Sequence, residues 1–367
     1  MTDAAVVGRI LREYRSGGLA PSCVRRRYGS VSGTRVGYQI SEPGGPEILV
    51  RAYRADEPLG AEFRGCGTAS VQEWLAGRAA TLAWLAARGY PAPRPVPTRE
   101  GDLVGVAGAW LTWATTDVPG RLLAPGRGQL GLLGAALGRL HALDPGGASG
   151  RGAPGAAVAG LASWHPAAAI PAALGRLDAV QGLLPAQWRP LHEGFRRTLR
   201  AVQDAAAGLP AAVVHGDARP GNAIVAAAGA ARGVPAQAVL AGWENCGLGL
   251  PVLDLGYCLL ETHLGPGRPG EPAGRRIEPD PGRIVAVLDG YARWRAPGDA
   301  ERRILADGIR FAAAYAGAIC FEQALIDGVR GPAMDARLDR LRNRFAAGQA
   351  VAALAARHLA GPGAAAR

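Results

Sequence analysis

Hydrophobic and polar residues follow a short, strand-like pattern in the first third of the chain. Two runs rich in β-branched and aromatic residues, 38–40 and 47–53, flank the turn-forming segment 43–46, as in an antiparallel hairpin. Another strand-like run covers 108–113. Apolar residues recur at helical spacing over 70–88. This part of the chain therefore predicts a small antiparallel sheet with one helix.

After residue 116 the pattern changes to long runs rich in Ala and Leu, with apolar residues at helical spacing. These runs are 129–143, 283–295, 300–327 and 334–359. We therefore expect an α+β protein with two lobes. The small, antiparallel β-rich N-terminal lobe with one helix would span 1–116, and the larger, mainly helical C-terminal lobe would span 117–360. Residues 361–367 predict a disordered tail.

Composition limits the partners more than the fold. The chain has 367 residues, of which 49% are hydrophobic, and this is enough for one large core or two adjoining lobes. Its formal net charge of +11 arises from Arg without any Lys. These basic residues are scattered and form no stripe interleaved with aromatics, so we expect no nucleic acid as a partner.

Targeting and cysteine patterns indicate a cytoplasmic protein. No apolar run approaches the length needed to cross a bilayer, and the first residues lack the basic and apolar regions of a signal peptide. We therefore expect no membrane as a partner. The five cysteines are far apart and form no C-x-x-C pair, which favours buried free thiols over disulfides or a zinc site. The oligomeric state is left open.

The most specific motif is the run HGDARPGN at 215–222, followed by AGWE at 241–244 and LDLG at 253–256. A carboxylate within reach of a substrate hydroxyl can orient it and accept its proton. Amide and carboxylate oxygens also suit a hard cation. An Asp, an Asn five residues later and a carboxylate after the next strand are typical of sites that transfer the γ-phosphoryl group of a nucleotide.

Together with Leu140 and His141 upstream, these motifs run in the order found in the aminoglycoside phosphotransferase and choline kinase family, which the chain resembles over about 36–328. The resemblance implies a bilobal kinase-like fold, with ATP and Mg as cofactors. It also implies a kinase whose small-molecule substrate is phosphorylated on a hydroxyl, such as a sugar, an aminoglycoside-like compound or a secondary metabolite. His141 lies on an apolar helix face and is expected in the core or at an interface.

The resemblance also assigns roles to single residues. Asp217 would be the catalytic base, and Arg219 would neutralise charge on the transferring group. Arg51 would contact the nucleotide, for which a permanently charged guanidinium is suitable. Two residues would be structural. Asp254 would bind the backbone of the catalytic loop, and His215 would anchor that loop.

One expected metal ligand is missing. By the resemblance, Asn222 would hold one magnesium ion, and an Asp at the position of Gly242 would bridge the metal to the phosphates. Glycine supplies no ligand, and a single amide oxygen is a poor site for a cation that prefers carboxylates. Glu244 would project to the same face as residue 242 if the strand continues, so it is a hypothetical metal ligand. A Glu is also common there in members that retain the Asp.

The N-terminal lobe shows a second departure. Ser70 is the expected N-cap of the helix, and the family's Glu position falls on Arg78 of its inward stripe. An Arg at this place cannot pair with Arg51. In a different helix register, Arg78 would be a solvated surface residue. The glycine-rich segment 29–35 could cover phosphates or form an ordinary hairpin turn.

Three functions follow from these features. The intact run 215–222 favours a small-molecule phosphotransferase. Gly242 and Arg78 together favour a pseudokinase that binds a nucleotide or metabolite without transferring phosphate. A third alternative is a repurposed, non-phosphoryl catalyst that uses Asp217 as a base in the same cleft.

Overall fold

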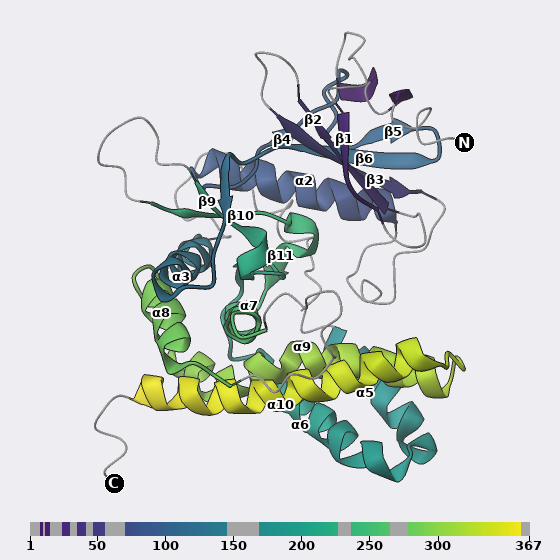
Figure 1. Ribbon diagram of the computed structural model, residues 1–367, viewed down its shortest axis with the longest axis vertical. Coiled ribbons are helices and arrows are strands. Elements are labelled where there is room, and N and C mark those ends of the chain that lie inside the picture. The colour runs from purple at the N-terminus through teal and green to yellow at the C-terminus, as the bar shows by residue number, and fades with distance from the viewer. Residues whose placement is uncertain are drawn as a thin grey trace.

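The described part of the chain has two lobes (Figure 1). A sheet with one helix lies at one end, and a larger group of helices lies at the other, so the expected α+β, bilobal architecture is confirmed. The computed structural model describes residues 8–9, 12–14, 24–29, 35–41, 47–55, 70–144, 169–226, 236–264 and 278–360. The predicted tail and residues 30–34 of the predicted glycine-rich segment lie outside these ranges.

The N-terminal sheet is antiparallel, with the strand order β1-β2-β3-β6-β4 and with β5 also paired to β6. The predicted hairpin corresponds to β2 and β3. The elements of this lobe are β1 (Val24–Gly29), β2 (Arg35–Ile40), β3 (Ile48–Arg54), α2 (Val71–Ala87), β4 (Pro95–Val96), β5 (Gly105–Ala107) and β6 (Trp110–Thr116).

Helix α2 begins where the sequence predicts. The Ser70 hydroxyl accepts a hydrogen bond from the Glu73 N–H, and the Glu73 carboxylate accepts one from the Ser70 N–H, each at 3.1 Å. The helix packs toward the sheet, with the Trp74 and Tyr53 ring centroids 5.3 Å apart. Arg78 is 0% exposed, which confirms the inward register and excludes the solvated one.

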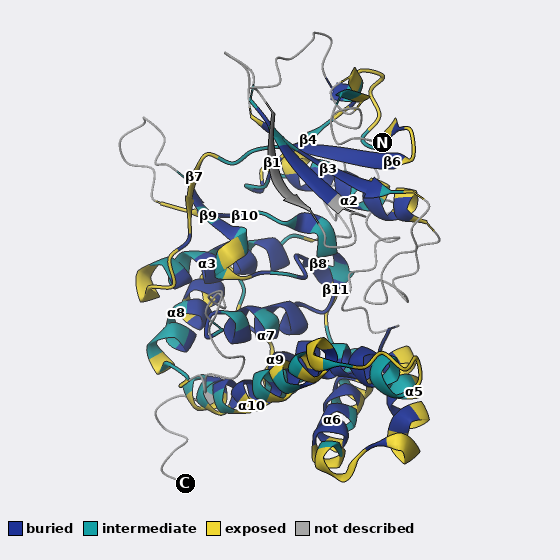
Figure 2. Ribbon diagram, turned by 45° about the vertical axis from the view of Figure 1, so that its right-hand side comes forward, coloured by how far each residue is buried: buried dark blue, intermediate teal, exposed yellow. Residues whose placement is uncertain are grey.

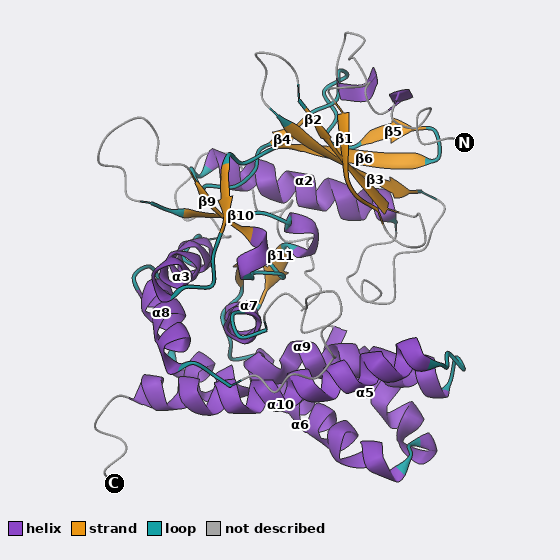
Figure 3. Cartoon of the chain, in the orientation of Figure 1, coloured by secondary structure: helices purple, strands orange, loops and turns teal. Residues whose placement is uncertain are grey.

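The C-terminal lobe is mainly helical, with two small sheets between its helices and the N-terminal lobe (Figure 3). One sheet has the order β10-β9-β7, and β11 pairs with β8 in the other. The strands are β7 (Gly120–Leu122), β8 (Ala212–Val214), β9 (Ala223–Ala226), β10 (Ala238–Leu240) and β11 (Gly247–Gly249). The helices are α3 (Arg127–His141), α5 (Ile170–Val180), α6 (Arg189–Ala206), α7 (Pro251–Glu261), α8 (Pro281–Ala292), α9 (Asp299–Leu325) and α10 (Pro332–Ala360).

Glycines allow α3 and α8 to approach closely. A Cβ atom on Gly134 of α3 would collide with the backbone of Val287, and one on Gly290 of α8 would collide with the backbone of Gly131. Replacing either glycine would therefore push the two helices apart and open the core between them.

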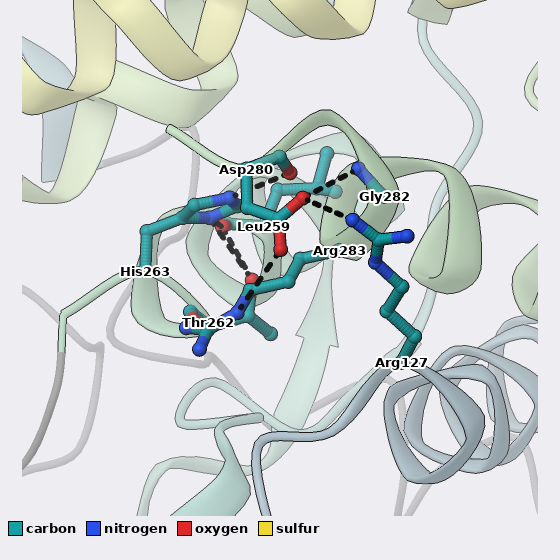
Figure 4. Close-up of polar contacts among 7 residues, drawn as sticks. All are labelled: Arg127, Leu259, Thr262, His263, Asp280, Gly282 and Arg283. Carbon is teal, nitrogen blue, oxygen red and sulfur yellow. Dashed lines mark hydrogen bonds and ion pairs between the residues drawn. The ribbon is translucent and has the colours of Figure 1, made fainter. Parts of the chain in front are cut away.

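Asp280 adds a polar tie between the same two helices (Figure 4). Its carboxylate caps α8 by accepting the Gly282 N–H at 2.8 Å, and it also accepts from Arg127 of α3 at 3.2 Å. Its backbone carbonyl lies 3.3 Å from Nε2 of the buried His263. Asp280 is therefore bound to other residues of the fold.

Helix α9 is the central helix of the C-terminal lobe. By length and composition it is apolar enough to cross a membrane, contrary to the expectation that no run approaches that length. However, 78% of its apolar window is buried inside the protein, between α5, α6, α7 and α10 (Figure 2). Burial on several sides explains a helix that is apolar nearly all round.

Candidate active site

Three side chains hold the carboxylate of Asp217, on the loop between β8 and β9. Its Oδ2 accepts a hydrogen bond from the Asn222 amide at 2.7 Å. Its Oδ1 accepts the Tyr257 hydroxyl at 2.6 Å and lies 3.1 Å from Nε of Arg219. Asn222 also donates to the Asp217 carbonyl at 3.0 Å, which closes the turn. The structure thus brings together the predicted Asp217, Arg219 and Asn222.

Tyr257 is a contact that the sequence analysis missed. It lies on α7, three residues after Asp254, and residues three apart share one helix face. Since Asp254 is predicted to contact the loop that carries Asp217, this spacing could have identified Tyr257. Its hydroxyl supplies a third, independent restraint on the Asp217 carboxylate.

Asp254 binds the backbone of the loop that carries Asp217. Its two carboxylate oxygens accept the backbone N–H groups of His215 and Gly216, at 2.6 and 3.1 Å. The side chain is 1% exposed, and Oδ2 also lies 3.2 Å from Nε2 of His141. Burial alone would raise the pKa of Asp254, but the hydrogen bond and charge of His141, together with His215, hold this pKa below its usual value. The carboxylate is therefore ionised when it binds the loop.

A buried chain of hydrogen bonds continues from His141 into the helical lobe. Nδ1 of His141 lies 2.9 Å from the Tyr291 hydroxyl, which accepts from Arg295 at 2.8 Å. Arg295 in turn donates to both carboxylate oxygens of Glu301 at 2.9 Å. The two ring nitrogens of His141 thus bridge the Tyr291 hydroxyl and the Asp254 carboxylate. The core histidine expected at 141 therefore orients Asp254.

His215 joins the loop to the end of β10. Its Nε2 lies 3.0 Å from the Ala241 carbonyl, and its Nδ1 accepts the Asp217 N–H at 3.2 Å. The ring is 0% exposed and meets Trp243 edge-on, with centroids 4.6 Å apart. Burial lowers the pKa of His215, so the imidazole is neutral, with Nε2 as the donor.

Gly242 lies directly beside Asn222. Its φ of 77° is in the left-handed region, which favours glycine. A Cβ built on Gly242 would lie 3.1 Å from the side-chain carbon and nitrogen of Asn222. A carboxylate at position 242 would therefore be adjacent to Asn222, and glycine leaves that place without a ligand.

Glu244 is directed at the N-terminal lobe. The chain after β10 forms a short 3₁₀ helix, η6 (Trp243–Asn245), and not a continued strand. The inference that Glu244 projects to the same face as residue 242 depended on a continued strand and is therefore wrong. Its Oε1 lies 2.5 Å from Nε of Arg51. To bind a metal, Glu244 would have to leave this ion pair.

Arg51 and Arg78 surround Glu244 from the sheet and from α2. Arg51 donates to the Thr115 hydroxyl at 3.3 Å and lies over the Trp113 ring. Arg78 donates to the Glu244 backbone carbonyl at 3.1 Å and lies 5.0 Å from the centre of the Trp74 ring. The acidic partner of Arg51 in the described structure thus comes from η6, while α2 contributes a second cation.

These residues do not fit a conventional magnesium site. The Asn222 amide nitrogen is used on Asp217, which leaves one neutral oxygen as a ligand, and position 242 offers none. Within the described residues, no group of three or more His, Cys, Asp or Glu side chains could hold a metal ion.

The fold and the loop that carries Asp217 indicate a protein of the kinase-like phosphotransferase class. A profile described as the phosphotransferase enzyme family matches residues 56–297. This match spans more than half of the chain, and the chain belongs to this family.

Solved structures of small-molecule kinases share the fold. An amicoumacin kinase in complex with AMP-PNP, Ca²⁺ and Ami superposes with a TM-score of 0.63 and 15% identity, over 94% of this chain and 93% of that chain. A spectinomycin phosphotransferase in complex with ADP and spectinomycin gives 0.56 and 13%, over 90% and 92%. A microcompartment-associated aminopropanol kinase gives 0.54 and 16%, over 98% of each chain. No curated protein matches the chain significantly by sequence.

Proposed function

We propose that this protein transfers a phosphoryl group from ATP to a hydroxyl group of a small molecule, with Asp217 as the catalytic base. The observation that carries this proposal is the restrained carboxylate of Asp217, bound by Tyr257, Asn222 and Arg219. A carboxylate held in this way can orient an acceptor hydroxyl and take its proton as the new P–O bond forms. ADP leaves as the other product.

The neighbouring arginines have distinct parts in this proposal. Arg219 has a half-exposed side chain beside Asp217 and can neutralise charge on the transferring group. Arg51, on β3 of the sheet, would contact the nucleotide phosphates. His215 and Asp254 act only on the loop backbone, which they hold against β10 and α7. Glu244 remains a hypothetical metal ligand that must first separate from Arg51.

A second candidate function is a pseudokinase that binds ATP or a metabolite without transfer. It is favoured by Gly242, which removes a metal ligand, and by the Arg51–Glu244 pair, which engages the nearest carboxylate. Loss of one electrostatic anchor of the transition state costs on the order of 3 kcal/mol, which corresponds to about a hundredfold in rate.

A cytoplasmic location, a lobe boundary at residue 116 and the lack of nucleic acid or membrane partners remain predictions.

Product formation separates the two candidates. The purified protein is incubated with ATP and hydroxyl-bearing amines, including antibiotics and amino alcohols, and phosphorylated products are measured by mass spectrometry. Transfer that falls at least about a hundredfold in Asp217→Asn would support the proposal. Asp307→Asn is the matched control, because Asp307 also pairs with an arginine, Arg310, but lies on α9. ATP binding without any product would favour the pseudokinase.

A further inference from the structure

Helix α10 reaches the candidate site from outside the part of the chain that the family profile matches. The profile ends at residue 297, and α10 begins at residue 332. The helix packs against α7, α8 and α9 (Figure 1). Near its middle, the side chain of Arg344 is directed at α7, the helix that carries Tyr257. The family resemblance assigns no role to this contact.

Arg344 contacts two residues of α7 that lie about one turn apart. Its guanidinium pairs with Oε1 of Glu261 and lies over the Tyr257 ring, 5.4 Å from the ring centre. Residues four apart share one face of a helix, so one long side chain can reach both. Arg344 therefore binds the same face of α7 from which the Tyr257 hydroxyl donates to Asp217.

Glu261 depends on a cation because it is largely buried. Its side chain is 10% exposed, and Oε1 is inaccessible to solvent. Burial, followed by the charge of Asp217, raises the pKa of Glu261, although Arg344 and Arg219 act in the opposite direction. A buried carboxylate that loses its partner is costly. The ion pair with Arg344 therefore compensates a charge that lies close to Asp217.

Arg219 is also within electrostatic reach of Glu261. It pairs with Asp217 at 3.1 Å, and its side chain is half-exposed. Burial lowers the pKa of Arg219, but the charges of Asp217, Tyr257 and Glu261 raise it above its usual value. Two carboxylates thus act on one guanidinium. An uncompensated Glu261 would compete with Asp217 for Arg219 and would repel the Asp217 carboxylate.

We infer that Arg344 is a positioning residue for the proposed phosphoryl transfer, and that it acts by compensating the charge of Glu261. Arg219 and the Tyr257 hydroxyl then stay bound to Asp217. Arg344 itself does not touch the reacting atoms. The inference rests on the proposed function, because it takes Asp217 as the base. It adds that the site requires α10, which the family profile does not cover.

A double-mutant cycle tests this inference. Transfer from ATP is measured for the full chain with the acceptor that yields the most product in the screen of antibiotics and amino alcohols. Arg344→Met removes the charge, and we expect kcat to fall about tenfold or more while the KM for ATP stays within about threefold. In a Glu261→Gln background there is no charge to compensate, so the same substitution should lower kcat by no more than about threefold.

The possible outcomes separate the inference from the proposed function. Equal losses of kcat in the two backgrounds would show that Arg344 does not act through the charge of Glu261, and would overturn the inference alone. An unchanged kcat in Arg344→Met would do the same. A wild type that phosphorylates no acceptor in the screen would overturn both the inference and the proposed function.

Arg342→Met is the matched control. Arg342 lies on the same helix, also pairs with an acid, Asp339, and also lies over an aromatic ring, that of Trp188. This variant should retain kcat within about twofold. Urea denaturation of each variant shows whether it folds. If Arg344→Met does not fold, Arg344→Gln replaces it with the same expected results, because Gln keeps a hydrogen-bond donor for Glu261 and lacks the charge.

Discussion

The two sides of the candidate site differ in how closely they follow the family pattern. On the C-terminal side, Asp254 and His215 hold the loop of Asp217 through hydrogen bonds to backbone groups. On the N-terminal side, Arg78 is a cation where the family resemblance predicts an acid, and Glu244 from η6 pairs with Arg51. The first side fixes the geometry of the loop, whereas the second side carries the charged groups Arg51, Arg78 and Glu244. Charge can change sign without altering the backbone, so the two sides can diverge independently.

The largest expected effect is a loss of folding stability when the C-terminal side of the site is disrupted. Asp254→Ala leaves two buried backbone N–H groups and His141 without their acceptor. We expect the free energy of unfolding to fall by about 3–5 kcal/mol, the usual cost of breaking a buried polar network. Urea denaturation measures this. Asp339→Ala, which removes an exposed helix-surface acid, should change stability by less than about 0.5 kcal/mol. Similar losses in both variants would contradict the structural role of Asp254.

The next effect concerns the orientation of Asp217. Tyr257→Phe removes the hydroxyl that donates to Oδ1 of Asp217, a hydrogen bond to a charged group worth about 1.5–3 kcal/mol. If transfer requires this orientation, kcat should fall about tenfold or more while ATP affinity is unchanged. Tyr90→Phe is the control, since it removes a buried hydroxyl bound to the Ala136 carbonyl. An unchanged kcat in Tyr257→Phe would show that Asn222 and Arg219 suffice.

A smaller effect is expected on the N-terminal side, where Arg78 can be tested for a role in ATP binding. Arg78→Met keeps the length of the side chain and removes its charge. The free energy of unfolding should fall by about 1–3 kcal/mol, because the Glu244 carbonyl loses its hydrogen-bond donor. ATP binding should weaken by about threefold or more. Arg88→Met is the matched control, because Arg88 also stacks on a tryptophan, Trp84, at the end of α2. Loss of stability with unchanged ATP binding would make Arg78 purely structural.

The smallest expected effect is a pH dependence from His215. Burial lowers its pKa, so the unfolded chain takes up a proton below about pH 6.5 that the folded protein does not bind. The stabilising contribution is complete above that pH and is lost as the pH falls toward the folded pKa. Between pH 7 and 5.5 the wild type should lose up to about 1 kcal/mol more than His215→Gln. Urea denaturation at both pH values measures these losses. Equal losses of stability in the wild type and in His215→Gln would contradict this prediction.

Strongly patterned elements were predictable because local physics determines them. Helix α2 has a capping box at Ser70 and an apolar stripe, and the long C-terminal helices α9 and α10 have helical periodicity over many turns. Helices α5 and α6 were missed. The 3₁₀ turn η6 was also missed, because the short run AGWE is as compatible with the end of a strand as with a 3₁₀ turn. That error changed the expected direction of Glu244.

The sequence alone determined the fold class, the family and the grouping of Asp217, Arg219 and Asn222, because these residues lie within one short loop whose spacing sets their geometry. Only the tertiary structure decided which residues from distant segments meet them. Tyr257 reaches Asp217 from α7, and Glu244 pairs with Arg51 across nearly two hundred residues of chain. Such pairings depend on how helices and sheet pack against each other. Local periodicity carries no information on that packing.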